Sequence, residues 1–165
     1  MPLDLTSIPI LDHHCHAFES RVAPYNALDF QRFFSEGGDE GIVAEHTPNS
    51  VFFRWAIKEL AQFLGCAPTT EAVLEARSEI PVNELGARML HEANIPVLLI
   101  DYGLGGADRM SIDDMKASLP KWRIEPILRL ETMAQELIMK YETFDDVVEA
   151  FVATIEAHAQ QGTLD

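Results

Sequence analysis

Basic residues are scarce in this sequence of 165 residues. It holds 12 Lys and Arg against 27 Asp and Glu, which gives a formal net charge of −15 with neutral histidines. Nucleic acids and anionic membrane surfaces bind through clusters of Lys and Arg, and the sequence has no such cluster. The charge balance therefore argues against nucleic acid and against membrane surfaces as partners.

Cysteines and long apolar runs are also few. Cys15 and Cys66 lie far apart and form no Cys-x-x-Cys motif. A disulfide framework is therefore not expected, and the expected location is a reducing cytoplasm. No apolar run reaches the roughly 18–20 residues that a membrane span requires. The amino-terminal segment carries Asp4 and no basic residue, unlike a secretory signal.

The overall composition is that of a globular chain. Hydrophobic residues make up 47% of the sequence and charged residues 24%, which is sufficient for one buried core. No repeat, low-complexity tract or linker divides the sequence. We therefore expect residues 1–165 to form a single domain.

Predicted strands and helices alternate along the sequence. Apolar runs predict strands over residues 8–16, 95–100 and 123–130. Apolar spacings of three and four and helix caps predict helices over 51–65, 70–79, 82–93, 111–119, 131–141 and 143–162. Residues 17–50 are expected to form a long loop. The alternation implies parallel crossovers and an α/β fold, in which the continuously apolar strand 95–100 is buried on both faces.

Three of the six histidines fall within four residues at the end of the first predicted strand, in Asp12-His13-His14-Cys15-His16. Alternate residues of a strand share a face, so His14 and His16 point the same way with Cα atoms about 6.6 Å apart. Two imidazoles at that separation can converge on one divalent ion. Sites of parallel α/β folds also gather at the carboxyl ends of strands. The alternative is that these histidines are polar strand-end residues with hydrogen-bond partners.

Other polar residues are expected at the same ends of the strands. Alternation turns Cys15 away from the two histidines, which favours a small buried side chain over a thiolate. Asp101 closes the second strand, where it contacts substrate or caps a loop. Arg129 and Glu131 close the third strand, and the arginine either binds a substrate carboxylate or pairs with the glutamate. Surface or supporting positions are expected for the other histidines, His46, His91 and His158.

The ordered set of motifs resembles one protein family. The apolar strand followed by Asp12-x-His14-x-His16 is similar to the opening of the metal-dependent amidohydrolase superfamily. Further segments resemble its amidohydrolase-2 branch, which includes domains fused to glutamine-synthetase-like proteins; these segments are residues 33–36, 60–66, 99–103 and 127–131. The resemblance covers nearly the whole sequence.

The resemblance implies a (β/α)8 TIM barrel with metal at the carboxyl ends of its strands. His14 and His16 then match the first two metal ligands of the family, and the metal is expected to be zinc, with manganese or iron as alternatives. In the family, metal-activated water attacks a carbonyl or amidine carbon. The catalytic acid and base come from later strands, so none is assigned here. Because a barrel requires about 250 residues, the chain is expected to be its N-terminal part, with about three βα units.

Three functions remain open at this point. The first is a metal-dependent hydrolase of the amidohydrolase type that cleaves a C–N bond of a small molecule. The second is a metal-dependent decarboxylase or isomerase on the same barrel, and the third is a non-catalytic fragment or regulatory domain. Open sheet edges invite pairing with another chain, so we expect either self-association or completion by a missing carboxyl-terminal part of the barrel.

Overall fold

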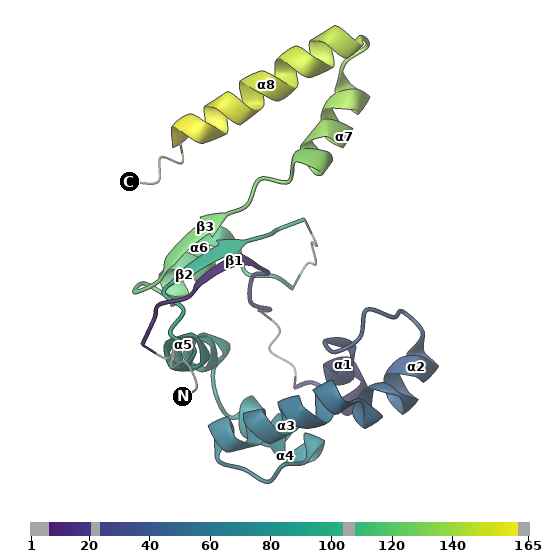
Figure 1. The fold of residues 1–165 in the computed structure, drawn as a ribbon, viewed down its shortest axis with the longest axis vertical. Coiled ribbons are helices and arrows are strands. Elements are labelled where there is room, and N and C mark those ends of the chain that lie inside the picture. Colours follow the sequence, from purple (N-terminus) through teal and green to yellow (C-terminus); the bar gives the residue numbers. More distant parts are fainter. Residues whose placement is uncertain (1–6, 21–23, 104–107, 162–165) are drawn as a thin grey trace, which may run out of the picture.

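The structure is a computed structural model, which describes residues 7–20, 24–103 and 108–161. At its centre lies a sheet of three parallel strands in the order β1-β2-β3 (Figure 1). The strands are β1 (Leu11–Cys15), β2 (Val97–Ile100) and β3 (Arg123–Pro126). All three predicted strands are present, although each is shorter than predicted, and the α/β class is confirmed.

Helices make up most of the rest of the described chain. They are α1 (Ala27–Arg32), α2 (Glu40–Glu45), the 3-10 turn η1 (Thr47–Asn49), α3 (Val51–Leu64), α4 (Thr70–Ser78), α5 (Val82–Glu92), α6 (Ile112–Ser118), α7 (Leu130–Lys140) and α8 (Phe144–Gln161). Each helix that the sequence predicted after residue 50 is present, with ends within a few residues of the prediction.

The caps explain why these boundaries agree. Side-chain oxygens of Ser50, Thr69 and Ser111 accept main-chain N–H groups in the first turns of α3, α4 and α6, at 3.1–3.2 Å. Such bonds satisfy donors that the first turn of a helix leaves without a partner. Gly65 ends α3 in the left-handed region with φ 73°, which glycine adopts at little cost.

The sheet and its neighbouring helices share one core. Leu98, Ile100 and Ile124 are buried together with Met115 of α6 and with Leu119, which follows that helix, and α5 packs against the same cluster. The alternate residues of β2 are only half-buried. The predicted burial of β2 on both faces is therefore not found.

A second core lies within the helices between β1 and β2. Phe30 of α1 packs against Phe53 of α3 with ring centroids 6.2 Å apart, and Ile57 and Val73 are buried beside them. The prediction of a loop over residues 17–50 is thus wrong for part of that segment, which contains α1, α2 and η1. The side chains of Asn26 and Asp39 cap these short helices.

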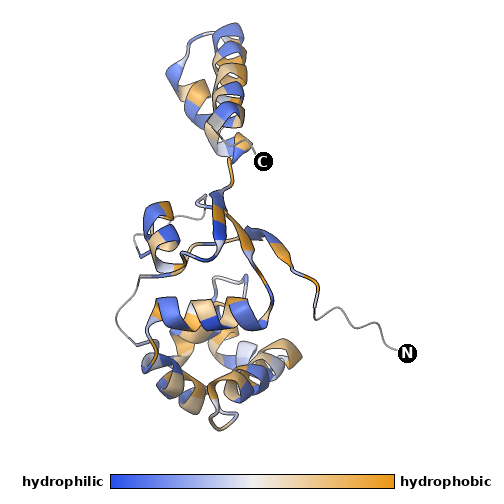
Figure 2. Cartoon of the chain, turned by 90° about the vertical axis from the view of Figure 1, so that its left-hand side faces the viewer, coloured by the Kyte–Doolittle hydropathy of each residue, from blue (hydrophilic) through white to orange (hydrophobic). Residues whose placement is uncertain are grey.

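Helices α7 and α8 form a hairpin at the opposite end of the molecule from α1–α4, with the sheet between them (Figure 2). Large apolar side chains of this hairpin are exposed: Met139 has an exposed fraction of 87% and Phe144 of 79%. Self-association through such faces stays a prediction.

The predicted fold class, an N-terminal part of a TIM barrel, is wrong. A barrel unit places one helix after each strand, but in this chain α1 to α5 all lie between β1 and β2. The described residues form a small α/β unit with an open three-stranded sheet, in which β1 and β3 are edge strands. The alternation of strands and helices is confirmed, whereas the barrel, which the family resemblance implied, is not.

Within the ranges that the structure describes, no helix is both long and apolar enough to cross a membrane.

Candidate functional site

The candidate site lies where β1 and β2 end, and an irregularity in β1 shapes it. Asp12 pairs with Leu98 and Cys15 with Ile100, so β1 uses one more residue than β2 over the same interval. Such a bulge redirects side chains and occurs often beside active sites. Strict alternation therefore does not hold through His13 and His14.

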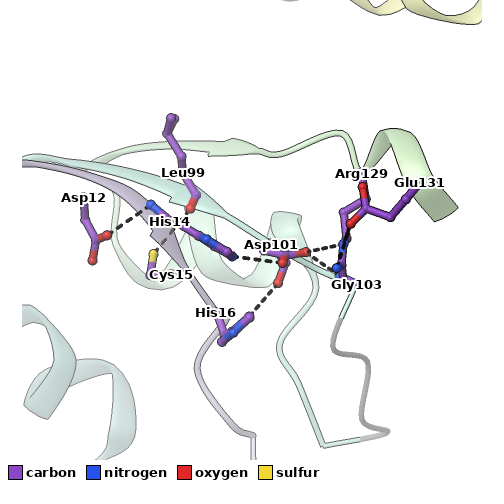
Figure 3. Close-up of polar contacts among 9 residues, drawn as sticks. All are labelled: Asp12, His14, Cys15, His16, Leu99, Asp101, Gly103, Arg129 and Glu131. Atoms are coloured by element: carbon purple, nitrogen blue, oxygen red, sulfur yellow. Dashed lines mark hydrogen bonds and ion pairs between the residues drawn. The ribbon is translucent and has the colours of Figure 1, made fainter. Parts of the chain in front are cut away.

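The two predicted ligands nevertheless come together around one residue. His14 Nε2 lies 3.0 Å from Asp101 Oδ2, and His16 Nδ1 lies 3.0 Å from the main-chain oxygen of Asp101 (Figure 3). The two imidazole rings have centroids 5.7 Å apart and an interplanar angle of 74°. A single residue at the end of β2 thus holds both histidines of β1.

Asp101 is itself held firmly. Its exposed fraction is 5%, and its Oδ1 accepts the main-chain N–H of Gly103 at 2.7 Å. That hydrogen bond lowers the pKa of the Asp101 carboxyl below its usual value, and the side chains of His14 and Arg129 lower the pKa further. Asp101 is therefore ionised at neutral pH.

These contacts determine the protonation of the neutral imidazole rings. A main-chain carbonyl only accepts hydrogen bonds, so His16 donates from Nδ1 and its Nε2 carries a lone pair. An ionised carboxylate also only accepts, so His14 donates from Nε2 and its Nδ1 carries a lone pair. Each neutral ring therefore keeps one unprotonated nitrogen, the kind of donor that a divalent metal ion takes.

Arg129 and Glu131 form an ion pair beside Asp101. The arginine places Nε 2.9 Å and Nη2 2.8 Å from the same oxygen of Glu131, while Nε lies 3.9 Å from Asp101. The pKa of Glu131 is lowered first by its own main-chain N–H and then by Arg129. The pair of Arg129 with Glu131 is thus present, and binding of a substrate carboxylate by Arg129 stays a prediction.

Gly103 makes this arrangement possible. A Cβ at this position would lie 1.9 Å from Cδ of Arg129, so only glycine lets the arginine lie across the loop. From the sequence, Gly103 is expected only to mark a loop after the second strand. The sequence Asp101-Tyr102-Gly103 nevertheless indicates the hydrogen bond between Asp101 and Gly103, because an aspartate in a turn often accepts the main-chain N–H two residues ahead.

Cys15 lies between the two histidines on β1 and is half-buried. Its thiol donates to the main-chain oxygen of Leu99 at 3.6 Å. Burial, together with the nearby charge of Asp12, raises the pKa of the Cys15 thiol to about 11. It is therefore protonated at neutral pH.

The remaining histidines lie outside the site. His46 adjoins α2, while His91 and His158 lie on α5 and α8, and all three are exposed. Their predicted surface positions are confirmed.

The donors present fit a metal ion in part. His14 and His16 supply two nitrogen donors, with the Asp101 carboxylate beside them. Across residues 7–20, 24–103 and 108–161, no group of three or more His, Cys, Asp or Glu is arranged to hold a metal ion. A structural zinc site takes four ligands, so this pair leaves coordination positions open.

Comparison with known proteins adds information on the fold. No family model matches the chain, and no curated protein matches its sequence. One solved structure of similar fold is that of a "putative metal-dependent hydrolase" from Lactobacillus casei, with a TM-score of 0.76 and 23% sequence identity. The match covers 96% of this chain, and the chain spans 41% of the length of that protein. The likeness therefore extends over the sheet and the helices around it, and it establishes a shared fold.

Proposed function

We propose that this protein is a metal-dependent hydrolase in which His14 and His16 bind a divalent metal ion, with zinc as the expected metal. The observation that carries the proposal is the convergence of the two imidazoles on Asp101, which leaves one unprotonated nitrogen on each ring. The description of the Lactobacillus casei protein of similar fold supports the same class of reaction.

The contacts of Asp101 are those expected around metal-binding histidines. Such histidines usually donate their second ring N–H to a carboxylate or a main-chain carbonyl, which fixes the ring and raises its basicity. Here the carboxylate of Asp101 holds His14, and its main-chain oxygen holds His16. If the histidines were only polar residues at the end of a strand, they would not both need to be held by one residue.

The reaction follows from the class of metal site. A bound divalent ion would lower the pKa of water toward 7 and polarise a carbonyl oxygen. The residues of the chain orient the ligands: Asp101 fixes both rings, and Gly103 and Arg129 fix Asp101. We assign the scissile bond as a C–N bond of a small carboxamide or amidine, in keeping with the resemblance to amidohydrolases.

Metal stoichiometry tests the ligand assignment. The chain is loaded with zinc, manganese or iron, passed over a desalting column and measured by elemental analysis. The double variant His14→Ala/His16→Ala is compared with His91→Ala/His158→Ala, which removes two exposed histidines on helices. We expect about one ion per chain in the unmodified protein and in the helix variant, and a large loss in the site variant.

The outcome that overturns the proposal is equal metal content in both double variants. Release of ammonia from carboxamides in the metal-loaded protein tests the hydrolase reading separately. Metal binding at these histidines without hydrolysis of any carboxamide would keep the metal site and refute the assigned reaction.

A further inference from the structure

A cavity of about 570 Å³ begins beside His16. It lies where the segment after β1 meets α1, α3 and α5, and its lining includes Phe18, Phe30, Trp55 and Leu85. Small-molecule sites commonly have volumes of roughly 300–1,000 Å³ and bury most of their ligand. The cavity is therefore of the size of a ligand site, and it adjoins one of the two proposed metal ligands.

Aromatic side chains line much of the cavity, and their rings pack against one another. Phe34 packs edge-to-face against Phe30 and Phe53, with ring centroids 5.3 and 5.1 Å away. Tyr25 packs against Phe33 with centroids 5.5 Å apart. Edge-to-face pairs of this kind hold rings in fixed orientations, and they present faces and edges that suit another ring.

The two arginines along the lining, Arg77 and Arg109, already contact groups of the protein. Arg109 Nη1 donates to the main-chain oxygen of Ala17 at 2.8 Å, and Nη2 lies 3.9 Å from Glu19. Tyr25 donates to the same glutamate, and the guanidinium of Arg77 lies 4.5 Å from the centre of the Tyr25 ring. An anionic ligand would compete with these contacts of the arginines, whereas a neutral apolar ligand would leave them intact.

We propose that this cavity binds the neutral aromatic body of the substrate, with the reacting carboxamide at His16. This inference rests on the proposed function and adds the substrate class, an aromatic carboxamide. Three observations carry it: the cavity adjoins His16, its walls are aromatic, and its two arginines already contact groups of the protein. The helices between β1 and β2 therefore determine specificity, while the strand ends hold the metal.

The two tryptophans provide a direct test of binding. Trp55 lines this cavity, while Trp122 lies against the sheet core. The probe is 4-nitrobenzamide, a neutral carboxamide whose nitro ring quenches tryptophan fluorescence. In metal-free Trp122→Phe protein we expect saturable quenching of Trp55. In Trp55→Phe protein we expect collisional quenching that rises linearly with probe concentration.

Filling the cavity supplies the matched comparison. Ala56→Phe adds a ring at a lining position of α3, and Lys58→Phe adds the same ring at an exposed position of α3 outside the lining. Each is made in the Trp122→Phe protein. We expect Ala56→Phe to weaken 4-nitrobenzamide binding by about tenfold or more, and Lys58→Phe to leave it unchanged. Met89→Trp narrows the cavity from α5, and its binding is read by isothermal titration if Ala56→Phe does not fold.

Several results would overturn the inference. One is quenching without saturation in the Trp122→Phe protein, and another is equal affinity in the Ala56→Phe and Lys58→Phe variants. Tighter binding of 4-nitrobenzoate than of 4-nitrobenzamide would show that the arginines recognise an anion instead. Since binding is measured without metal, loss of the cavity proposal and loss of the His14/His16 metal site are separate results.

Discussion

Replacing Gly86 by alanine tests how tightly the segment after β1 packs on α5. The sequence shows Gly86 only as an unfavourable residue within a predicted helix. In the structure it is buried, and a Cβ there would lie 2.1 Å from Cε2 and 2.4 Å from Cζ of Phe18. The ring of Phe18 therefore lies directly over the backbone of α5.

Two opposing effects determine the magnitude. Alanine in place of glycine favours the helix by about 1 kcal/mol. Ordinary contact begins at 3.4 Å, so the Phe18 ring must move by about 1.3 Å. The ring packs against the core of the sheet, and overpacking of this kind costs about 1–3 kcal/mol. We expect Gly86→Ala to lower the free energy of unfolding by about 1 kcal/mol in net terms.

A double-mutant cycle separates the two effects. The four proteins are the unmodified chain, Gly86→Ala, Phe18→Leu and the double variant, and urea unfolding is followed by far-ultraviolet circular dichroism. With the ring removed, the added methyl group has room, so Gly86→Ala should stabilise the Phe18→Leu protein by up to about 1 kcal/mol. The coupling between the two positions is then about 1–3 kcal/mol.

Equal stabilisation by Gly86→Ala in both backgrounds would refute this reasoning. It would mean that the Phe18 ring does not lie over α5 and does not form the wall of the cavity beside His16. The direction of the change is decisive, because helix propensity alone predicts stabilisation in both backgrounds.

Three further predictions concern single contacts. Ser50→Ala removes the acceptor for the Phe53 N–H and should lower the free energy of unfolding by about 1 kcal/mol in urea denaturation, with Ser50→Asp retaining the cap. Asp101→Asn should weaken zinc binding by about 10–100-fold in a competition titration with a chelator, and an unchanged affinity would contradict the role of its carboxylate. In metal-free Cys66→Ser protein, iodoacetamide at pH 8 should modify Cys15 roughly 100-fold more slowly than in urea, because its pKa of about 11 exceeds the ordinary 9.0. Modification of Cys15 in the folded protein as fast as in urea would refute the burial of the thiol. The same raised pKa of Cys15 should lower the free energy of unfolding as the pH rises from about 9 toward about 11.

Local signals explain why most elements were predictable. Ser50 and Thr69 precede apolar residues at helical spacing, and Gly65 follows the last of them. These residues act within one or two turns, so their effect does not depend on the rest of the chain. The same holds for β2, whose continuous apolar run ends in Asp101.

The short helices α1 and α2 were not predictable in this way. Each has six residues, and isolated helices of that length are unstable in water. Packing across the chain stabilises α1: Phe30 lies against Phe53 of α3, 23 positions later in the sequence. Glycines around α2 further favoured a loop. Because long-range contacts stabilise these helices, the sequence pattern alone indicated an irregular segment.

The proximity of the two histidines was predictable from the sequence, but the geometry around them was not. The sequence predicted that His14 and His16 lie close together, and their ring centroids are 5.7 Å apart, although a bulge interrupts the alternation of β1 between Asp12 and Cys15. Their shared contact with Asp101 depends on the register of β1 against β2, which a single sequence does not show. The role of Gly103 depends in turn on where Arg129 lies, and the two residues are 26 positions apart.

The segment after β1 connects the candidate site to the cavity. Met110 N–H donates to the oxygen of Phe18 at 2.8 Å, and Ser20 N–H donates to the oxygen of Asp108 at 2.6 Å. These hydrogen bonds fix the chain immediately after His16 against the segment that precedes α6. The main chain at Phe18, whose ring lies over Gly86, is therefore held in place close to His16. A substrate whose ring occupies the cavity would thus place its carboxamide at His16 in a defined orientation, and holding reacting groups in such an orientation accelerates a reaction.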